Sequence, residues 1–218
     1  AWYQKGRAYH DLKNYKKAIE CHDKATKLEP KRANAWYQKG RAYHDLKNYK
    51  KAIACYDKAT NLGPKDAYTW NCKGRANNGP KNFKQSFTCF DKVTKIDPKD
   101  ANAWHNKGNA HHELKNYKKA IACYDKATKI NPKYSEAHNN MGNILFLTKK
   151  YKDALVWVNK AIKFDKNNVN AYETKCSILY ELKKYLQALA AGEKSVKMGS
   201  KDKDTLHEIK KIKKILKK

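Results

Sequence analysis

Hydrophobic and polar residues alternate along the chain with the spacing of amphipathic helices. In the first half of residues 1–34, Trp2, Gly6 and Tyr9 recur at intervals of four and three. The second half repeats such intervals, in Ala18, Cys21, Ala25 and Leu28. This spacing places side chains on one face of a helix. Each half therefore predicts one amphipathic helix, and the two together predict a helical hairpin.

The residues between these segments predict where the helices begin and end. Asn14 lies between the two halves, and Pro30 stops the second helix. Asp66 and Asp100 stand where they can cap a following first helix. Because Gly6 has no side chain, it lets the two helices approach closely.

The whole pattern recurs with a period of 34 residues. Six copies follow one another, at 1–34, 35–68, 69–102, 103–136, 137–170 and 171–204. One hairpin cannot bury both of its faces, so neighbouring copies are expected to stack, and the terminal faces need a polar cap. Residues 205–218 predict a basic amphipathic capping helix from about Thr205. Its apolar face comprises Leu206, Ile209, Ile212, Ile215 and Leu216. The alternative is a helix that lies on an anionic membrane or is captured by a partner.

The chain resembles the tetratricopeptide repeat (TPR) family, prokaryotic type. In the second copy the family's signature falls on Trp36, Lys39, Gly40, Tyr43, Ala52, Tyr56, Ala59 and Pro64. The resemblance implies an all-α fold, a right-handed superhelical α-solenoid of six helix-turn-helix repeats with a C-terminal capping helix. We expect the superhelix to complete less than one turn.

Three departures from the family pattern carry expectations of their own. A Lys replaces the family's Leu in most copies, and we expect its stem to pack while the ammonium reaches water; these residues are Lys5, Lys39, Lys73, Lys107 and Lys175. Gly79-Pro80 in the third copy predicts that its first helix ends early or kinks, with the loss of its last turn. In the sixth copy Cys176 replaces the glycine and Gly192 the aromatic residue, which favours a terminal role.

In this family the first helices line a concave face that holds partners. The resemblance therefore implies a peptide-binding groove at positions three, seven and ten of the copies, with some neighbouring asparagines. The candidate residues are Tyr3, Arg7, Tyr37, Arg41, Asn71, Arg75, His105, Asn106, Asn109, Asn139, Asn140, Asn143 and Phe146. Chaperone-binding relatives carry Lys and Asn at positions three and seven, where copies one and two carry Tyr and Arg, which argues against chaperone C-termini as ligands.

Two asparagines in the groove are candidates for holding a peptide backbone. Asn106 and Asn140 resemble the asparagine ladder in the TPR superhelix of O-linked N-acetylglucosamine transferases. An amide donates to a peptide carbonyl and accepts from its N–H; the alternative is a solvated polar residue. Phe146 and Leu147 offer an apolar pocket beside these amides, or pack against the neighbouring hairpin.

Arginine recurs at position seven, in Arg7, Arg41 and Arg75. Its planar guanidinium suits a carboxylate or a phosphate. The alternative is that Asp11 and Asp45, four residues further on, neutralise the first two. Since Arg75 faces Gly79 at that offset, it is the strongest candidate anion ligand.

The composition is strongly basic. Lys+Arg 49 against Asp+Glu 21 give a net charge of +28. Such a charge favours an acidic protein partner and nonspecific nucleic acid at low salt, although a bias toward lysine produces it without any ligand. No stretch approaches the roughly 20 apolar residues of a transmembrane segment.

The sequence offers little support for catalysis or cofactors. Four of the 6 Cys recur every 34 residues, which predicts reduced thiols at one structural position, as in a cytoplasmic protein. No CxxC pair, phosphate loop or nucleophile elbow appears, so we expect no cofactor, no metal and no enzyme. The leading hypothesis is a cytoplasmic protein-interaction scaffold that binds an extended or helical peptide in its groove. The alternatives are RNA or anionic-membrane binding through the basic surface, and a structural module that self-associates through its terminal repeats.

Overall fold

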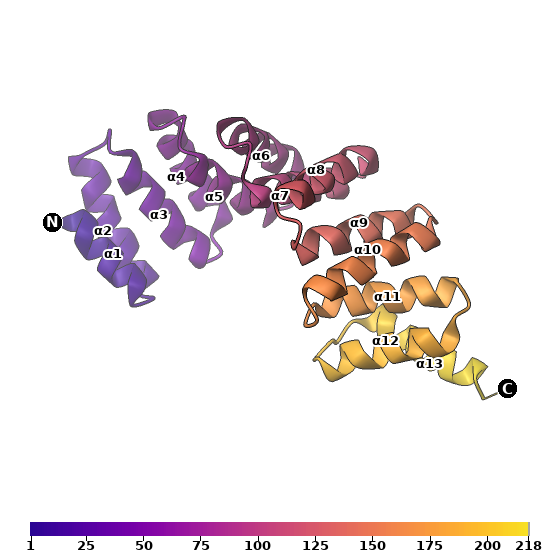
Figure 1. The fold of residues 1–218 in the computed structure, drawn as a ribbon. Helices are drawn as coiled ribbons and strands as arrows, with labels where there is room; N and C mark the ends of the chain where they lie inside the picture. The colour runs from indigo at the N-terminus through magenta and orange to yellow at the C-terminus, as the bar shows by residue number, and fades with distance from the viewer. Residues whose placement is uncertain (218) are drawn as a thin grey trace. The chain divides into compact units, whose positions relative to one another are not determined.

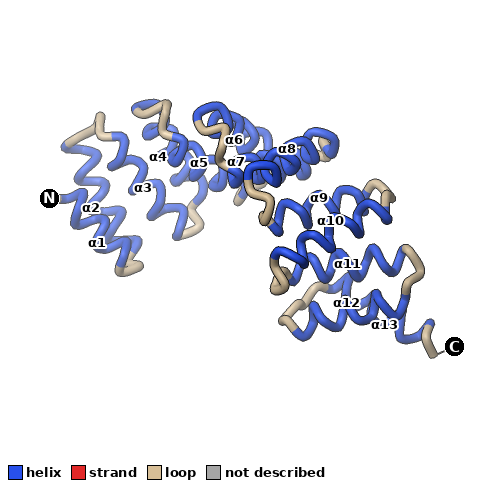
Figure 2. The backbone as a smooth tube through the Cα atoms, in the orientation of Figure 1, coloured by secondary structure: helices blue, strands red, loops and turns tan. Residues whose placement is uncertain are grey.

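The chain is entirely helical in the computed structural model, which describes residues 1–217. In that range thirteen helices are joined by short loops, with no strand (Figures 1 and 2). They form two compact units, residues 1–115 and residues 116–218, of which Lys218 lies outside the described residues. The N-terminal unit contains α1 Trp2–Asp11, α2 Tyr15–Leu28, α3 Ala33–Asp45, α4 Tyr49–Leu62, α5 Ala67–Asn78, α6 Phe83–Ile96 and α7 Ala101–Glu113. The C-terminal unit contains α8 Tyr117–Ile130, α9 Ser135–Leu147, α10 Tyr151–Phe164, α11 Val169–Glu181, α12 Tyr185–Lys197 and α13 Lys203–Ile215.

This arrangement confirms the predicted fold class. Within the units the hairpins are α1–α2, α3–α4, α5–α6, α9–α10 and α11–α12, and neighbouring helices of successive copies pack on one another, as α2 does on α3 and α10 on α11. The result is roughly six helix-turn-helix repeats followed by a capping helix. From the second copy on, the first helix begins two residues before the 34-residue boundary, for example at Ala33.

The turn inside each hairpin has the same backbone geometry in all six copies. A Lys adopts the left-handed conformation, with φ between 57° and 61°, at Lys13, Lys47, Lys81, Lys115, Lys149 and Lys183. In copies one and two an Asn caps the following helix, since Asn14 Oδ1 accepts from the Lys17 N–H at 3.2 Å and Asn48 repeats this contact. These contacts confirm the predicted boundary between the two helices.

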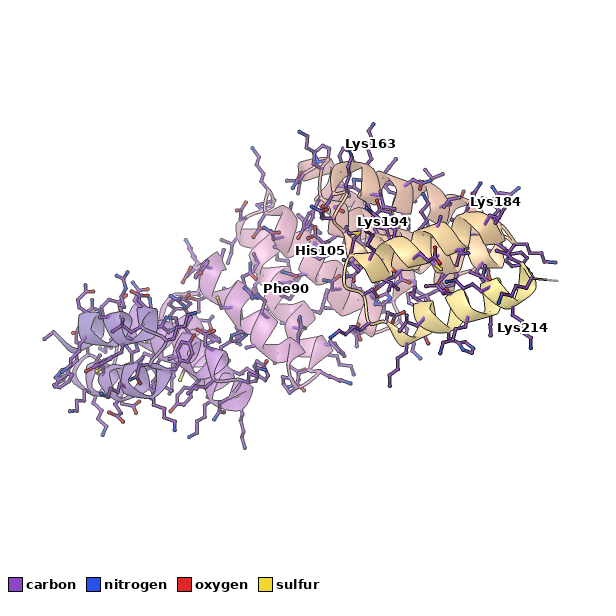
Figure 3. The ribbon with its side chains drawn as sticks, turned by 90° about the horizontal axis from the view of Figure 1, so that it is seen from below. Phe90, His105, Lys163, Lys184, Lys194 and Lys214 are labelled. Carbon is purple, nitrogen blue, oxygen red and sulfur yellow. The ribbon has the colours of Figure 1, made fainter. Side chains whose placement is uncertain are left out.

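In copies one to three the hairpin closes where a glycine meets a ring, and in copy five Gly142 meets Val158 instead. A Cβ on Gly40 would lie 2.8 Å from the Tyr56 ring, so only glycine fits there. Phe90, in the interior of the third copy, takes the place of Tyr56 (Figure 3). The sixth copy inverts the pair, because a Cβ on Gly192 would lie 2.9 Å from the Cys176 sulfur. The two departures in that copy therefore compensate each other.

A tryptophan contact joins consecutive copies. The Trp36 indole N–H donates to the Pro30 carbonyl at 2.9 Å. The same hydrogen bond recurs, in Trp70 with Pro64, Trp104 with Pro98, and His138 with Pro132. The ring thus ties the start of one copy to the loop that ends the previous copy; we call this the Trp–Pro contact.

An ion pair also joins consecutive copies. Lys39 Nζ lies 2.6 Å from Asp23 of the previous copy. The same pair recurs at 2.7 Å, in Lys73 with Asp57 and Lys107 with Asp91. We call this the Lys–Asp contact. The expectation that these ammonium groups simply reach water was wrong, since the preceding second helix presents a carboxylate to each.

Lys175 lacks this acidic neighbour, because Asn159 occupies the corresponding place in copy five. Burial consequently lowers the pKa of Lys175. At Lys39 burial also acts to lower the pKa, but the hydrogen bond and charge of Asp23 outweigh it and raise the pKa. The carboxylate therefore decides whether a half-buried lysine here is stabilised in its charged form.

The third copy differs less than Gly79-Pro80 suggested. Helix α5 ends early, as expected, at Asn78, but this is only one residue sooner than α3 ends in its own copy, so the expected loss of a whole turn was wrong. Gly79 stays near helical geometry, with φ −55° and ψ −54°. Pro80 removes only one donor, the counterpart of the Leu46 N–H that bonds to Ala42 O at 3.2 Å.

Helix α13 begins at Lys203, two residues sooner than predicted, and packs against α11 and α12. Ile212 is fully buried and Ile209 nearly so, which agrees with a capping role. The predicted apolar face was too wide, however, since Leu206, Ile215 and Leu216 are 38–42% exposed. Glu208 instead turns inward and accepts a hydrogen bond from Ser177 at 2.9 Å.

Candidate binding site

The two candidate residues of copy one, Tyr3 and Arg7, differ in burial and in contacts. Tyr3 is half-buried, with the Arg32 guanidinium 4.4 Å above its ring. Arg7 is exposed and makes no hydrogen bond or ion pair with any residue of 1–217. Asp11 therefore does not neutralise Arg7 in the described structure.

Three of the four candidates of copies two and three are brought together. Tyr37 and Arg41 on α3 and Arg75 on α5 line one cavity of about 110 Å³. We call it the α3–α5 cavity; its full lining is Tyr37, Arg41, His44, Asp45, Tyr56, Tyr68, Cys72 and Arg75. All eight residues belong to the N-terminal unit.

Arg41 is held in place by neighbours on two copies. Its guanidinium donates to Gln38 Oε1 at 3.4 Å and to His10 Nδ1 at 3.4 Å. The other ring nitrogen of His10 donates to Asp45 at 2.7 Å. The interpretation that Asp45 directly neutralises Arg41 was therefore wrong, because the His10 ring lies between them.

Tyr37 is the most buried of the candidates in this cavity, only 8% exposed. Its ring makes an edge contact with Tyr68 at 5.5 Å. Its hydroxyl is buried, and neither Tyr68 nor Cys72 forms a hydrogen bond of ordinary geometry with it. Burial raises the pKa of Tyr37 well above the usual value, so the phenol keeps its proton and remains a donor.

Two asparagines at position three have buried amide oxygens without partners. Asn71 on α5 is half-buried, and Asn139 on α9 is buried; in both, Oδ1 makes no hydrogen bond. An unsatisfied buried acceptor costs about 1–3 kcal/mol. A ligand that donates an N–H would recover this free energy.

The remaining candidates fall on α7 and α9, in different units. His105, Asn106 and Asn109 are half-buried on α7, and burial lowers the pKa of His105 to about 4, so it is neutral at physiological pH. Asn140, Asn143 and Phe146 are half-buried on α9. Phe146 packs against the Tyr151 ring at 5.7 Å and joins a hydrophobic cluster, which favours the packing interpretation over an open apolar pocket.

Sequence reasoning missed the cavity and both contacts between copies. Trp36, Trp70 and Trp104 each follow a proline by six residues, and this spacing was a usable signal. The cavity had no such signal, because a repeat pattern does not tell which side chain of one copy faces the next. To predict which side chains face each other, the packing angle between hairpins must be known.

Other chemistry is sparse in the part of the chain that the structure describes. No group of three or more His, Cys, Asp or Glu side chains in residues 1–217 is arranged to hold a metal ion. The six cysteines form no disulfide in the described structure, and five of them are buried. Among the thirteen described helices, none combines the length and the apolar character needed to cross a bilayer.

Stacked helical hairpins with a cap and a polar cavity between first helices define a helical-repeat scaffold. The tetratricopeptide repeat family matches residues 1–32, 33–66, 101–134 and 135–168, more than half of the chain. The chain therefore belongs to the tetratricopeptide repeat family, whose members are typically non-catalytic and interact with other proteins. The unmatched copies are the third and the sixth, which carry the departures described above.

Solved structures with the same fold are distant in sequence. The chain is similar to the pilF protein of Pseudomonas aeruginosa, with 16% identity, a TM-score of 0.77, and coverage of 97% of this chain and 95% of that one. It is similar to MamA from Desulfovibrio magneticus RS-1, with 20% identity, a TM-score of 0.72, and coverage of 77% and 94%. It is also similar to YrrB, described as a TPR protein with an unusual peptide-binding site, with 19% identity, a TM-score of 0.67, and coverage of 88% and 99%. No curated protein matches the chain in sequence.

Proposed function

We propose that this protein is a scaffold that binds an extended or helical peptide of a protein partner along its first helices. The observation that carries the proposal is the unpartnered amide oxygen of Asn71 on α5, the helix that also contributes Tyr68, Cys72 and Arg75 to the α3–α5 cavity. A peptide N–H is the natural donor for such an oxygen. The family's association with protein partners supports the same conclusion.

The charge distribution favours a protein over a nucleic acid as the specific partner. Residues 1–115 carry 25 Lys and Arg against 11 Asp and Glu, and residues 116–218 carry 24 against 10. Each unit thus has a net charge of +14. Exposed lysines such as Lys163, Lys184 and Lys214 extend into solvent (Figure 3). A charge spread this evenly attracts polyanions weakly and without a focused site.

The test is a pull-down with the full chain at physiological ionic strength, followed by nuclease treatment. We expect a protein partner that survives nuclease and crosslinks to first helices such as α3 and α5. Once this partner is isolated, Asn71→Ala should weaken its binding about two- to ten-fold. Asn61→Ala, on the exposed end of α4, is the matched control. Loss of all captured material on nuclease treatment, or crosslinks confined to the second helices, would contradict the proposal.

A further inference from the structure

Another cavity lies in the C-terminal unit, between the two helices of copy six. Its volume is about 460 Å³, a size typical of small-molecule sites. Helices α11 and α12 supply its lining, which consists of Tyr172, Lys175, Gln187, Ala190, Ala191 and Lys194. Of these residues, Lys194 is labelled in Figure 3. We call this space the α11–α12 cavity; it contains none of the candidate groove residues.

The α11–α12 cavity coincides with side chains that are smaller in copy six than in copy one. At three of its positions copy six has Tyr172, Ala190 and Ala191, where copy one has Trp2, Glu20 and Cys21. Smaller side chains leave part of the space between the two helices unfilled. The walls are a phenol ring, two methyl groups, an exposed amide and the stems of two lysines, so they are largely apolar.

Two lysines give this cavity a positive charge that no protein group balances. Lys175 is half-buried and Lys194 is exposed, and neither makes an ion pair or a ring contact with any residue of 1–217. No acidic side chain is among the described residues that line the cavity. Burial lowers the pKa of Lys175, which is the expected effect on an ammonium group without a counter-ion.

The position of Lys175 binds a carboxylate in other copies. Its equivalents in copies two to four each hold an aspartate at 2.6–2.7 Å and lie 4.5–5.0 Å from the centre of a tryptophan ring. Copy six has neither partner, since Asn159 replaces the aspartate and Tyr172 replaces the tryptophan. A ligand can therefore supply to Lys175 the carboxylate that this position binds elsewhere in the chain.

Lys194 also lacks a contact that its equivalents make. In copy one Lys24 lies 4.2 Å from the centre of the Trp2 ring, and in copy five Lys160 lies 4.2 Å from that of Trp157. Copy six contains no tryptophan. Lys194 is therefore available as a second cation beside the cavity.

We infer that the α11–α12 cavity binds a small aliphatic carboxylate, whose head group pairs with Lys175 and Lys194 and whose chain covers the apolar walls. An ammonium group forms a charge-assisted hydrogen bond with a carboxylate but not with a neutral amide. Each CH₂ group that is fully buried adds about four-fold in affinity. The site lies outside the candidate groove, so this inference does not rest on the proposed function.

The experiment is a titration of the full chain, followed through its backbone amide signals in proton–nitrogen correlation spectra. The probes are hexanoate, its neutral isostere hexanamide, the shorter carboxylate acetate, and hexyl phosphate. We expect saturable shifts with hexanoate at Lys175 and Ala191, and none at their copy-two equivalents, Lys39 and Cys55. Hexanoate should bind about ten-fold or more tightly than hexanamide or acetate.

Two variants test the contact with the head group. Lys175→Met should weaken hexanoate binding about ten-fold or more, and the fold tolerates this residue, because copy five carries Met141 at the same position. Asn159→Asp gives Lys175 the carboxylate partner that Lys39 has, so it should weaken hexanoate binding about five-fold or more. Asn159→Ala adds no charge and is the matched control, which should bind hexanoate like the wild type.

A third variant tests the second cation. Lys194→Gln should weaken hexanoate binding about two- to three-fold, because its ammonium group is exposed. Lys197→Gln, on the exposed end of the same helix, should leave binding unchanged. Four results would overturn the inference: equal binding of hexanoate and hexanamide, tighter binding of hexyl phosphate, equal shifts in copy two, or unchanged binding by both Lys175→Met and Asn159→Asp.

Discussion

Copies one and two are nearly the same sequence in different surroundings. They share their first nineteen residues and differ at six positions, yet the equivalent side chains behave differently. Arg7 is exposed, whereas Arg41 is held by a histidine from copy one and lines a cavity to which copy three contributes Cys72 and Arg75. The environment of a residue in this chain is therefore set by the adjacent copies as much as by its own.

The ring that faces the hairpin glycine shows the same contrast within the core. Copy two uses Tyr56 and copy one uses His22, and both are almost fully buried. Neither ring nitrogen of His22 has a hydrogen-bond partner. Copy one therefore buries the imidazole of His22, whose nitrogens are unpartnered, where copy two buries the larger ring of Tyr56. We expect copy one to be the less stable of the two.

The largest expected effect is the removal of the copy-two ring. Tyr56→Ala should lower the free energy of unfolding by about 3–5 kcal/mol, because it leaves a cavity beside Gly40. His22→Ala should cost less, since the lost ring is smaller and its nitrogens are unpaired. Denaturant unfolding of both variants measures the difference; equal losses would contradict the contrast between the copies.

The second effect depends on pH. Burial, with a smaller contribution from the charge of His10, lowers the pKa of His22 from 6.5 to about 4; Asp23 opposes this shift and Lys39 adds to it. Because the unfolded chain takes up this proton first, the contribution of His22 to stability is intact above pH 6.5. It is lost as the pH falls from 6.5 toward 4, by roughly 2–3 kcal/mol.

His22→Tyr, which installs the copy-two residue, should remove this share of the acid sensitivity. The measurement is the free energy of unfolding of the wild type and the variant at pH 7.5 and at pH 4.5. His207→Tyr, at an exposed position of α13, is the control. An identical pH dependence in wild type and His22→Tyr would refute the role given to His22.

The Lys–Asp contact gives the third effect. Lys39→Met should cost about 1.5 kcal/mol, since it leaves Asp23 without its partner at 2.6 Å. Lys5→Met should cost less, because Lys5 is exposed and makes no ion pair with any residue of 1–217. Thermal melts at low and high salt should show the cost of Lys39→Met shrinking as screening increases. A cost that is equal for the two variants would show that the contact is not specific to the junction.

The smallest effect concerns the junction after each copy. Asp66 caps α5 by accepting from the Tyr68 N–H at 3.1 Å, and it also accepts from Thr69. Asp66→Ala should therefore cost about 1 kcal/mol. Arg32, its counterpart after copy one, makes no capping hydrogen bond and has only an exposed ion pair with Glu29 and a contact with the Tyr3 ring. Arg32→Ala should therefore cost less than Asp66→Ala, about 0.5 kcal/mol. A larger loss from Arg32→Ala than from Asp66→Ala would contradict this difference.

The sequence was sufficient for the helices, because their signals are local. Intervals of three and four, Asn14 at a helix start and Asp66 at another all act within a few residues. The limits of local reasoning appear at Gly79-Pro80, where the loss of one donor was mistaken for the loss of a turn. A Cβ on Gly79 would lie 2.4 Å from the Tyr49 ring, a contact with copy two that no local rule contains.

The candidate site was predictable only in part. Period and family placed Arg41, Arg75 and Tyr37 on first helices, but not in one cavity. The position of Tyr37 depends on Tyr68 and Cys72 of the following first helix, α5, which pack over it. The ring of His10 between Arg41 and Asp45 likewise depends on the copy before. Such relations follow from the angle between hairpins, on which a single repeat unit carries no information.

The Trp–Pro and Lys–Asp contacts bear on how a gene for this chain changes in length. At every junction from copy one to copy four, one side supplies Asp and Pro and the other side supplies Lys and Trp. An unequal crossover that adds or removes 34 residues in this stretch regenerates both contacts at the new junction between copies. Any other insertion length leaves a carboxylate and an indole facing the wrong residues. Selection for folding alone would therefore allow whole repeats to be gained or lost while it removes fractional ones.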